Sequence, residues 1–340
     1  MTKILTLFPQ KFSNSMLADV WKCEMYFFRR YCQHLVGSNT NPDALAGSNF
    51  ARACELVRKA YHNEHLSIDE AINIGYDYLL TAQDTGHSIK TNERLALTLR
   101  KYFQTFPLDS NLIPAELSDG THAIEYTFDF DLGIPHPDIP GTNISFRGKL
   151  DGLYDLKHLG KTVKKYILDE KTTGSVSRLP GTKIVDEVKE SNKHKMSGQW
   201  LAYHWAARQL GVKPDSTLVR KVPLLTNYEP AFELELPVTD FMIQQWCVST
   251  MEKIVELIEK YKYYKENING VKGAYPHSVF YPIYQTGCND WGKMCQYSEG
   301  CSSSYGEKML FSTHKQMIFD HYDMTEPTPL ADYLKEKHIE

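Results

Sequence analysis

The sequence has no long hydrophobic run and no excess of positive charge, and each absence excludes a class of protein. No stretch of about 18 uninterrupted apolar residues occurs, so neither a membrane-spanning helix nor a membrane partner is expected. The opening residues MTKILTLFPQKFSNSM contain no apolar core of a signal peptide. Lysine and arginine total 38 against 42 acidic residues, which gives a net charge of −4. A nucleic-acid site would therefore have to be a local basic patch.

Seven cysteines form an odd set, which does not suit a disulfide framework, and clustered cysteines more often bind metal. Cys288, Cys295 and Cys301 lie close together in a segment without a clear helical or strand period. They indicate a metal site that needs a fourth ligand, because iron–sulfur clusters and structural Zn²⁺ both commonly take four thiolates. The spacing leaves open the metal and the fourth ligand, for which the candidates are Cys23, Cys32, Cys54 and Cys247.

Helical and strand periods follow one another in an order that indicates an α/β (α+β) fold. Helices are expected over residues 14–35, 46–62, 67–83, 92–106, 193–210 and 239–267. Alternating apolar and polar residues predict strands over 123–134, 144–156, 164–173, 216–225 and 231–238. The order is helices, a three-stranded meander, a helix, two strands and a last helix, which predicts one compact body with a cysteine-bearing segment after it.

Two aspartates and a lysine lie on the second and third strands of the meander. Because side chains alternate faces along a strand, Asp169 and Lys171 should point one way and Glu170 the other. A hairpin between the strands would bring Asp151 beside Asp169, and carboxylates are ligands that Mg²⁺ and Mn²⁺ prefer. A nearby ammonium offsets developing charge, so Lys171 suits phosphodiester hydrolysis. The alternative is a solvated strand end without a site, which is the commoner place for charged residues.

Three motifs occur in the order found in a known nuclease family. The runs are Gly148-Lys149-Leu150-Asp151-Gly152, Leu168-Asp169-Glu170-Lys171-Thr172-Thr173 and Gln199-Trp200-Leu201-Ala202-Tyr203. They resemble the second motif, the D-x-K-T-T motif and the Q-x-x-x-Y motif of RecB-family nucleases in the PD-(D/E)XK superfamily.

The resemblance implies a role for each motif. Asp151, Asp169 and the main-chain carbonyl of Glu170 would bind Mg²⁺ or Mn²⁺, and Lys171 would be catalytic. Gln199 and Tyr203, four residues apart on one helix face, would line the active site. For these last two residues alone, packing within a core helix is the alternative.

The first motif departs from the family's form. The family has a glycine followed four residues later by a histidine, whereas this chain has Gly47 and Ala51. Glu55 lies one helical turn beyond Ala51 and is expected to reach the metal in place of the histidine. The family also places Glu125 on the strand before Asp151, in a structural or substrate-facing role.

The resemblance extends to the cysteines. In AddB-like and Cas4-like nucleases, one cysteine on an early helix joins three near the far end to hold a [4Fe–4S] cluster. Cys23, within WKCEMYFFRRY, and the triplet Cys288, Cys295 and Cys301 match that arrangement. A structural Zn²⁺ ion is the alternative, and either would tie the chain ends together by closing a very long loop. The remaining cysteines are interpreted as buried apolar residues: Cys32, Cys54 and Cys247.

The resemblance implies a restriction-endonuclease-like core with a central mixed sheet flanked by helices, and an iron–sulfur-bound C-terminal segment tied to an N-terminal helix. The expected regions are an N-terminal helical region at 1–110, a nuclease core at 111–270 and a cluster segment at 271–340. The expected activity is a metal-dependent deoxyribonuclease, acting as an exonuclease on DNA ends or single strands in recombination, repair or phage DNA processing. It would work in the cytoplasm of a bacterial or phage-infected cell, with a helicase or recombination protein as partner.

Contacts to DNA phosphates are expected from a local basic rim that includes Arg178, Lys193 and Lys195. Two other functions stay open at this stage. One is a catalytically weak, cluster-bearing DNA-binding subunit, which the missing histidine favours. The other is a structure-selective or nicking endonuclease.

Overall fold

The computed structural model describes residues 6–36, 42–117, 120–224, 229–269, 276–281, 288–290, 293–298, 301, 315–318 and 328–329. Contacts group the chain into two compact units, each built from separate segments. Unit 1 comprises Met1–Asn39, Phe128–Gly148 and Gln245–Glu340, and unit 2 comprises Thr40–Thr127 and Lys149–Gln244. The expected division into a helical region at 1–110, a nuclease core at 111–270 and a cluster segment at 271–340 is a functional one, and it stays a prediction.

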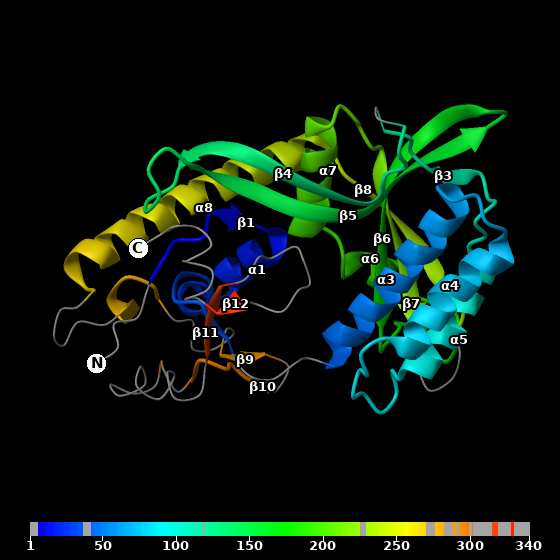
Figure 1. Cartoon of the computed structure of the whole chain (residues 1–340), viewed down its shortest axis with the longest axis horizontal. Helices are drawn as coiled ribbons and strands as arrows, with labels where there is room; N and C mark the ends of the chain where they lie inside the picture. Colours follow the sequence, from blue (N-terminus) through cyan, green and yellow to red (C-terminus); the bar gives the residue numbers. More distant parts are fainter. Residues whose placement is uncertain are drawn as a thin grey trace. The chain divides into compact units, whose positions relative to one another are not determined.

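A seven-stranded mixed sheet contains the meander expected from the sequence (Figure 1). Its strands are β1 Lys11–Phe12, β3 Leu112–Pro114, β4 Ile124–Pro135, β5 Asn143–His158, β6 Lys161–Thr173, β7 Ser216–Pro223 and β8 Phe232–Pro237. The main path is β1–β5–β6–β7–β8, with β3 and β4 also paired to β5. β5 and β6 are antiparallel, β6 and β7 parallel, and β7 and β8 antiparallel. The predicted mixed sheet is therefore confirmed.

Three helices of unit 2 lie side by side, and the first of them packs against β6 (Figure 1). They are α3 Pro42–His62, α4 Ile68–Thr81 and α5 Asn92–Thr105. The start of α4 is a capping box, in which Ser67 and Glu70 each bond to the other's backbone N–H. Thr91 caps α5 by a single bond, in which its side-chain oxygen accepts from the Arg94 N–H. Apolar residues at helical spacing form the core between these helices, including Phe50, Ala53, Val57, Leu79, Leu95 and Leu99.

Unit 1 contains the first helices and most of the longest one. Its elements include α1 Asn14–Lys22, α2 Glu24–Phe27, the π-helical turn η1 Phe28–Cys32, β2 Leu35–Val36, α8 Asp240–Asn267, η2 Pro276–Ser278, β9 Asn289–Asp290, β10 Lys293–Met294, β11 Lys315–Ile318 and β12 Thr328–Pro329. The first residues of α8 belong to unit 2. Glu24 lies 2.6 Å from Lys253 and 2.8 Å from Lys260, so ion pairs tie α2 to α8.

The prediction of a single helix over 14–35 is wrong. The helix breaks at Cys23, whose φ of −168° and ψ of 115° are extended, and then resumes as α2. The following residues form the wider π turn, a feature that often accompanies functional sites. Helical period does not reveal this break, because no glycine or proline marks it.

The prediction of a helix over 193–210 is wrong at its start. α6 covers Glu187–Asn192 and α7 covers Gly198–Gln209, with a turn between them. In that turn Met196 has a φ of 61°, a left-handed conformation that is uncommon for a bulky side chain and ends any helix. The turn lets α7 start in a new direction.

Two glycines that flank Asp151 are required by close packing. A Cβ atom at Gly148 would overlap the Phe128 ring, and one at Gly152 would lie 2.5 Å from the Tyr154 ring. Neither separation leaves room for a methyl group without a shift of β5 or of the ring. The glycines of this motif therefore serve the packing of the strand that carries Asp151.

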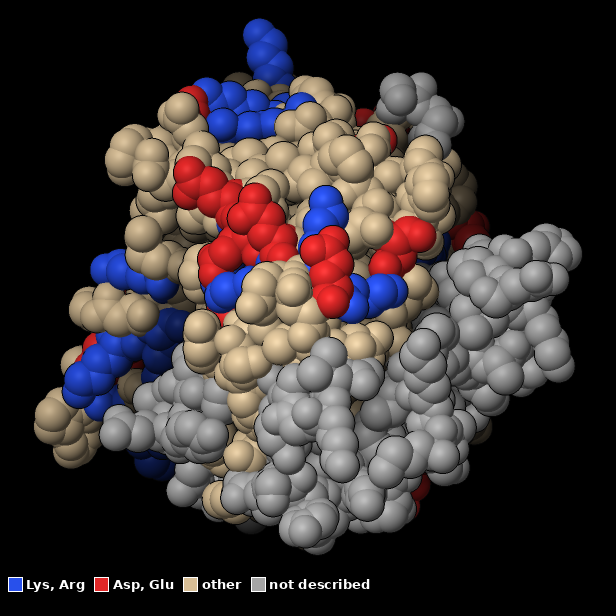
Figure 2. All heavy atoms as spheres, turned by 90° about the vertical axis from the view of Figure 1, so that its left-hand side faces the viewer, with Lys and Arg blue, Asp and Glu red and all other residues tan. Residues whose placement is uncertain are grey.

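Acidic and basic side chains lie side by side on part of the surface. On the face that Figure 2 shows, acidic side chains gather near the centre with basic side chains beside them. The net charge of the chain is also slightly negative, at −4. A polyanion would therefore have to bind at a local basic patch. In the part of the chain that the structure describes, no helix is long and apolar enough to cross a membrane.

A buried ion pair holds α3 to the sheet. Arg58 on α3 contacts both carboxylate oxygens of Glu170 on β6, and each side chain is only 2% exposed. Tyr102 on α5 donates to the same carboxylate. Burial alone would raise the pKa of Glu170, but the Arg58 charge and these hydrogen bonds lower it. Because a buried charge needs a partner, this contact fixes α3 against β6.

Removing one charge of this pair should destabilise the fold strongly. In Glu170→Gln the Arg58 guanidinium stays buried without its counter-charge, and we expect the free energy of unfolding to fall by about 3–5 kcal/mol. Urea denaturation followed by circular dichroism measures the change. Lys164→Ala is the control, because Lys164 forms an exposed pair with Glu235 that should contribute less than about 1 kcal/mol. Equal stability of Glu170→Gln and wild type would contradict this role.

Candidate functional site

The β5–β6 hairpin brings two aspartates to one face of the sheet. Gly152 pairs with Leu168 in the antiparallel register, so Asp151 and Asp169 come next on the two strands. The backbone N–H of Glu170 donates to Asp151 Oδ2 at 2.9 Å, which holds the Asp151 side chain against β6. The hairpin expected from the sequence therefore places the two carboxylates close together.

Asp169 is fully buried beside Lys171. Lys171 Nζ donates to Asp169 Oδ1 at 2.9 Å. Burial raises the pKa of Asp169 to about 8, with the Lys171 ammonium opposing this rise and the Asp151 charge adding to it. Burial also raises the pKa of Asp151. The buried carboxylate of Asp169 and the half-buried one of Asp151 thus share the Lys171 ammonium, and such a pair favours the arrival of further positive charge.

Two glutamates extend this acidic group. Lys149 Nζ lies 2.6 Å from Glu125 Oε2 and 3.6 Å from Glu55 Oε2. Burial raises the pKa of Glu125 to about 8, and the Asp151 charge adds to the rise. For Glu55 on α3, burial is outweighed by cations such as Lys59 at 2.6 Å, and its pKa is lowered. Positive charge is therefore scarcer at Glu125 than at Glu55.

One buried carboxylate oxygen of this group, Glu125 Oε1, accepts no hydrogen bond. Asp169 Oδ2 lies 2.9 Å from Lys171 Nζ, and Glu55 Oε2 lies 3.6 Å from Lys149 Nζ. Glu125 also has a φ of 54°, in the left-handed region. A buried acceptor without a donor is rare in folded proteins, so Glu125 Oε1 fits a donor set for a hard cation. Across the described ranges, no group of three or more His, Cys, Asp or Glu side chains is placed to hold a metal ion.

α7 carries Gln199 and Tyr203 on the face turned to Asp169. Gln199 Nε2 donates to Tyr203 Oη at 2.9 Å and to Asp169 Oδ1 at 3.2 Å. Lys171 Nζ lies 5.3 Å from the centre of the neighbouring Trp200 ring, a cation–π distance. The four-residue spacing thus brings both the amide and the phenol to the candidate site.

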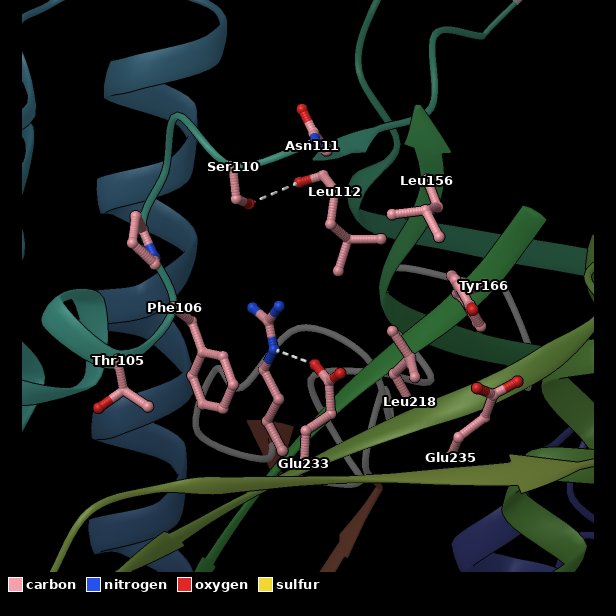
Figure 3. Close-up of a pocket in the computed structure, with 12 residues that line it drawn as sticks. Thr105, Phe106, Ser110, Asn111, Leu112, Leu156, Tyr166, Leu218, Glu233 and Glu235 are labelled. Carbon is pink, nitrogen blue, oxygen red and sulfur yellow. Dashed lines mark hydrogen bonds and ion pairs between the residues drawn. The ribbon is translucent and has the colours of Figure 1, made fainter. Parts of the chain in front are cut away.

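The opposite face of β6 and β7 has a separate hollow of about 430 Å³ (Figure 3). There Arg220 lies 4.1 Å from the centre of the Phe106 ring and donates to Glu233 at 2.8 Å. Arg220 is the register partner of Glu170, so the hollow lies on the face turned away from Asp169. Its guanidinium is already matched by a carboxylate, and the hollow takes no part in the candidate site.

The three basic residues expected to meet DNA differ in their surroundings. Arg178 is paired with Glu229, and Lys193 Nζ lies 2.5 Å from Glu190. Lys195 has no acidic partner among the residues described and lies at an apolar pocket beside α7. The charge of Lys195 is thus more available to a phosphate than that of the other two.

The four cysteines expected to bind a metal come together in unit 1. The Cys295 N–H donates to the Cys288 carbonyl at 2.8 Å. Burial raises the pKa of Cys301 to about 11, and, against the opposing charge of Arg29, the thiols of Cys23, Cys295 and Cys288 raise it further. These effects indicate that the four thiols lie near one another, although no three described cysteines are placed to hold a metal ion.

Tyr297 ties this cysteine segment to the first helices. Its hydroxyl donates to the Leu35 carbonyl at 2.5 Å, and its ring centre lies 5.1 Å from that of Tyr26. The interpretation of the remaining cysteines as buried holds for Cys32 and Cys54, whereas Cys247 is only half-buried.

Comparisons with known proteins give little direct guidance. No protein-family model matches the chain, and no curated protein sequence matches it. Among solved structures, the chain is similar to a proposed exonuclease from Eubacterium rectale, at 14% identity and a TM-score of 0.40, over 74% of this chain and 82% of that one. It is also similar to SSO0001, at 16% identity and a TM-score of 0.25, over 59% and 74% of the two chains. Similarities this distant carry no argument about function.

The attachment of α7 to the sheet gives a testable pH dependence. His204 on α7 is fully buried, with Nε2 3.0 Å from Thr217 Oγ1 on β7. Burial, followed by the Arg208 charge, lowers the pKa of His204 from 6.5 to about 4. The unfolded chain therefore binds a proton between these values that the folded chain does not, so stability should fall as pH falls from about 6.5 to about 4.

We expect this single group to contribute a loss of roughly 3 kcal/mol over that interval. Chemical denaturation of wild type and His204→Gln at several pH values measures it, and the variant should lack this component. His158→Gln, at the exposed end of β5, is the matched control and should keep the wild-type slope. Parallel stability curves for His204→Gln and wild type would contradict the burial of a neutral imidazole.

Proposed function

We propose that this chain is a deoxyribonuclease that depends on Mg²⁺ or Mn²⁺, of the PD-(D/E)XK type. The observation that carries the proposal is the meeting of Asp151, Asp169 and Lys171 on adjacent strands, with one buried and one half-buried carboxylate beside one ammonium. Neither aspartate is neutralised in the way that Glu170 is by Arg58 on the other face. The single-strand or DNA-end substrate comes from the motif resemblance.

The donor set fits a hard divalent cation. Asp151, Asp169 and the main-chain carbonyl of Glu170 would hold Mg²⁺ or Mn²⁺, since oxygen ligands suit both ions. When bound, such an ion lowers the pKa of a coordinated water and offsets charge on the phosphoryl oxygens. Glu125 or Glu55 would complete the set, and we favour Glu125 because its pKa is raised whereas that of Glu55 is lowered.

The protein's own groups would orient the reaction. Lys171, now bonded to Asp169, would turn toward the water that attacks phosphorus or toward the phosphoryl oxygens as negative charge develops. The bond from phosphorus to the leaving oxygen then breaks, and that oxygen takes a proton. Gln199 bridges Asp169 and Tyr203, so it would keep the carboxylate and the substrate strand in position.

The cysteine site would have a structural role. Cys23, Cys288, Cys295 and Cys301 supply four neighbouring thiols, which fit a [4Fe–4S] cluster or a structural Zn²⁺ ion. The resemblance favours the cluster. In either case the C-terminal segment would be held to the early helices by metal bonds in addition to the Tyr297 contacts.

Loss of one metal ligand should abolish cleavage and leave the fold intact. We expect Asp151→Ala, Asp169→Ala and Lys171→Ala each to reduce cleavage of end-labelled DNA in Mn²⁺ by at least about a thousandfold, because these groups act as a unit. Removing a buried, mutually repelling carboxylate should cost little stability. Linear and closed circular substrates, compared side by side, also separate exonuclease from endonuclease action.

Asp155→Ala is the matched control for this experiment. Asp155 lies on β5 near Asp151, but it is bonded to Lys157 at 3.1 Å and Lys165 at 2.8 Å instead of facing the site. Its removal should leave cleavage near the wild-type rate. Wild-type activity in Asp169→Ala would contradict the proposed site, and a complete lack of cleavage by wild type would favour a DNA-binding subunit.

The cysteine assignment has its own test. Protein purified without oxygen should be brown and contain iron, and Cys23→Ser, Cys288→Ser, Cys295→Ser and Cys301→Ser should each bleach it and lower its melting temperature. Cys247→Ser and Cys54→Ser are controls that should keep the colour. Stoichiometric zinc without iron would show that the four thiols bind Zn²⁺ instead of a cluster. Full metal content in Cys23→Ser would contradict the proposed set of ligands.

A further inference from the structure

An apolar pocket of about 240 Å³ opens beside the N-terminus of α7. Its walls include Trp200 and Leu201 of α7, Leu236 at the end of β8 and Met242 at the start of α8. The turn before α7 supplies the rim, through Met196 and Lys195. Pockets for drug-sized molecules measure roughly 300–1,000 Å³, so this one admits a smaller, flat apolar group such as one ring system.

The pocket is next to the proposed catalytic groups. Its wall residue Trp200 follows Gln199, whose amide donates to Asp169 at 3.2 Å. The same indole ring centre lies 5.3 Å from Lys171 Nζ. A group held in the pocket would therefore contact the same indole ring that lies close to the catalytic lysine.

The rim combines a strained apolar residue with a cation. Met196 is 70% exposed and has a φ of 61°. Glycine adopts this left-handed conformation without strain, whereas a methionine does not. Strained backbone that surrounding structure maintains is frequently found at ligand sites. Lys195 has no acidic partner among the described residues. The site thus presents an apolar interior with the single positive charge of Lys195 at its mouth.

A nucleotide has the complementary composition, with a flat apolar base and an anionic phosphate. Aromatic and thioether side chains are adaptable surfaces for such rings, and a lysine at the rim suits the backbone phosphate. We infer that this pocket receives one unpaired base of the strand being cut, adjacent to the scissile phosphate. The inference rests on the proposed nuclease function and adds that cleavage requires a base free to leave its stack.

The most direct test uses a single-stranded oligonucleotide in which one internal nucleotide lacks its base. Wild-type protein in Mn²⁺ should cut one of the two bonds beside the abasic nucleotide roughly ten- to hundredfold more slowly than the same bond in the intact strand. The sugar and phosphates are unchanged, so the difference measures the base alone. A sequencing gel of the end-labelled products reads each bond separately.

Pocket variants locate the effect. Met242→Trp, which fills the pocket from α8, should slow cleavage of intact single strands at least tenfold and leave the abasic bond at its already slow rate. Met196→Gly keeps the left-handed backbone while removing the rim side chain, and should act in the same direction more weakly. Phe241→Trp is the matched control, because Phe241 is 68% exposed on the same helix and is absent from the pocket lining.

Equal cleavage beside normal and abasic nucleotides would overturn the inference while leaving the nuclease in place. Folded Met242→Trp protein that cuts single strands at the wild-type rate would also overturn the inference, because cleavage would then not require a base in the pocket. Absence of cleavage on every DNA substrate would instead overturn the proposed function, and the inference with it.

Discussion

The antiparallel pairing of β5 with β6 is the constraint on which the rest of the site depends. The register that sets Gly152 opposite Leu168 brings Asp151 to Asp169, and the hydrogen bond from the Glu170 N–H to Asp151 locks the arrangement at 2.9 Å. A slip of one residue would exchange the faces of β6 and bury Lys171 where Glu170 now meets Arg58. The Arg58–Glu170 pair therefore protects the register, because only one alignment gives each buried charge its partner.

The carboxylates on the two faces of β6 have opposite electrostatic environments. On one face the carboxylate of Glu170 is fully matched by Arg58 and Tyr102, and its pKa is lowered. On the other face Asp169 shares one ammonium with Asp151, and burial raises its pKa to about 8. The first arrangement stabilises the fold, whereas the second makes ionisation of the Asp169 carboxyl unfavourable. A carboxyl group with a pKa perturbed in this way is a mark of binding and catalytic sites.

The sequence predicted those parts of the molecule that follow a simple period. Strand alternation was enough to separate Asp169 and Lys171 from Glu170, and the four-residue spacing of Gln199 and Tyr203 was enough to place both on one helix face. The sequence did not predict helix breaks that no glycine or proline marks, such as those at Cys23 and at the turn around Met196. Arg58 and Lys149 were not predicted either, because a pairing between residues distant in sequence leaves no local signal. Glu125 was expected on the strand before Asp151, but no feature of the sequence AIEYTFDF indicates its left-handed backbone.

A crystal structure of the protein soaked in Mn²⁺, with anomalous diffraction measured at the manganese edge, tests the central claim most directly. We predict an anomalous peak between the carboxylates of Asp151 and Asp169, within bonding distance of both and of the Glu170 carbonyl oxygen, with Lys171 displaced from Asp169. The same data would show whether Glu125 or Glu55 completes the site. A well-ordered structure with the Lys171–Asp169 contact intact and no manganese at these aspartates would contradict the account.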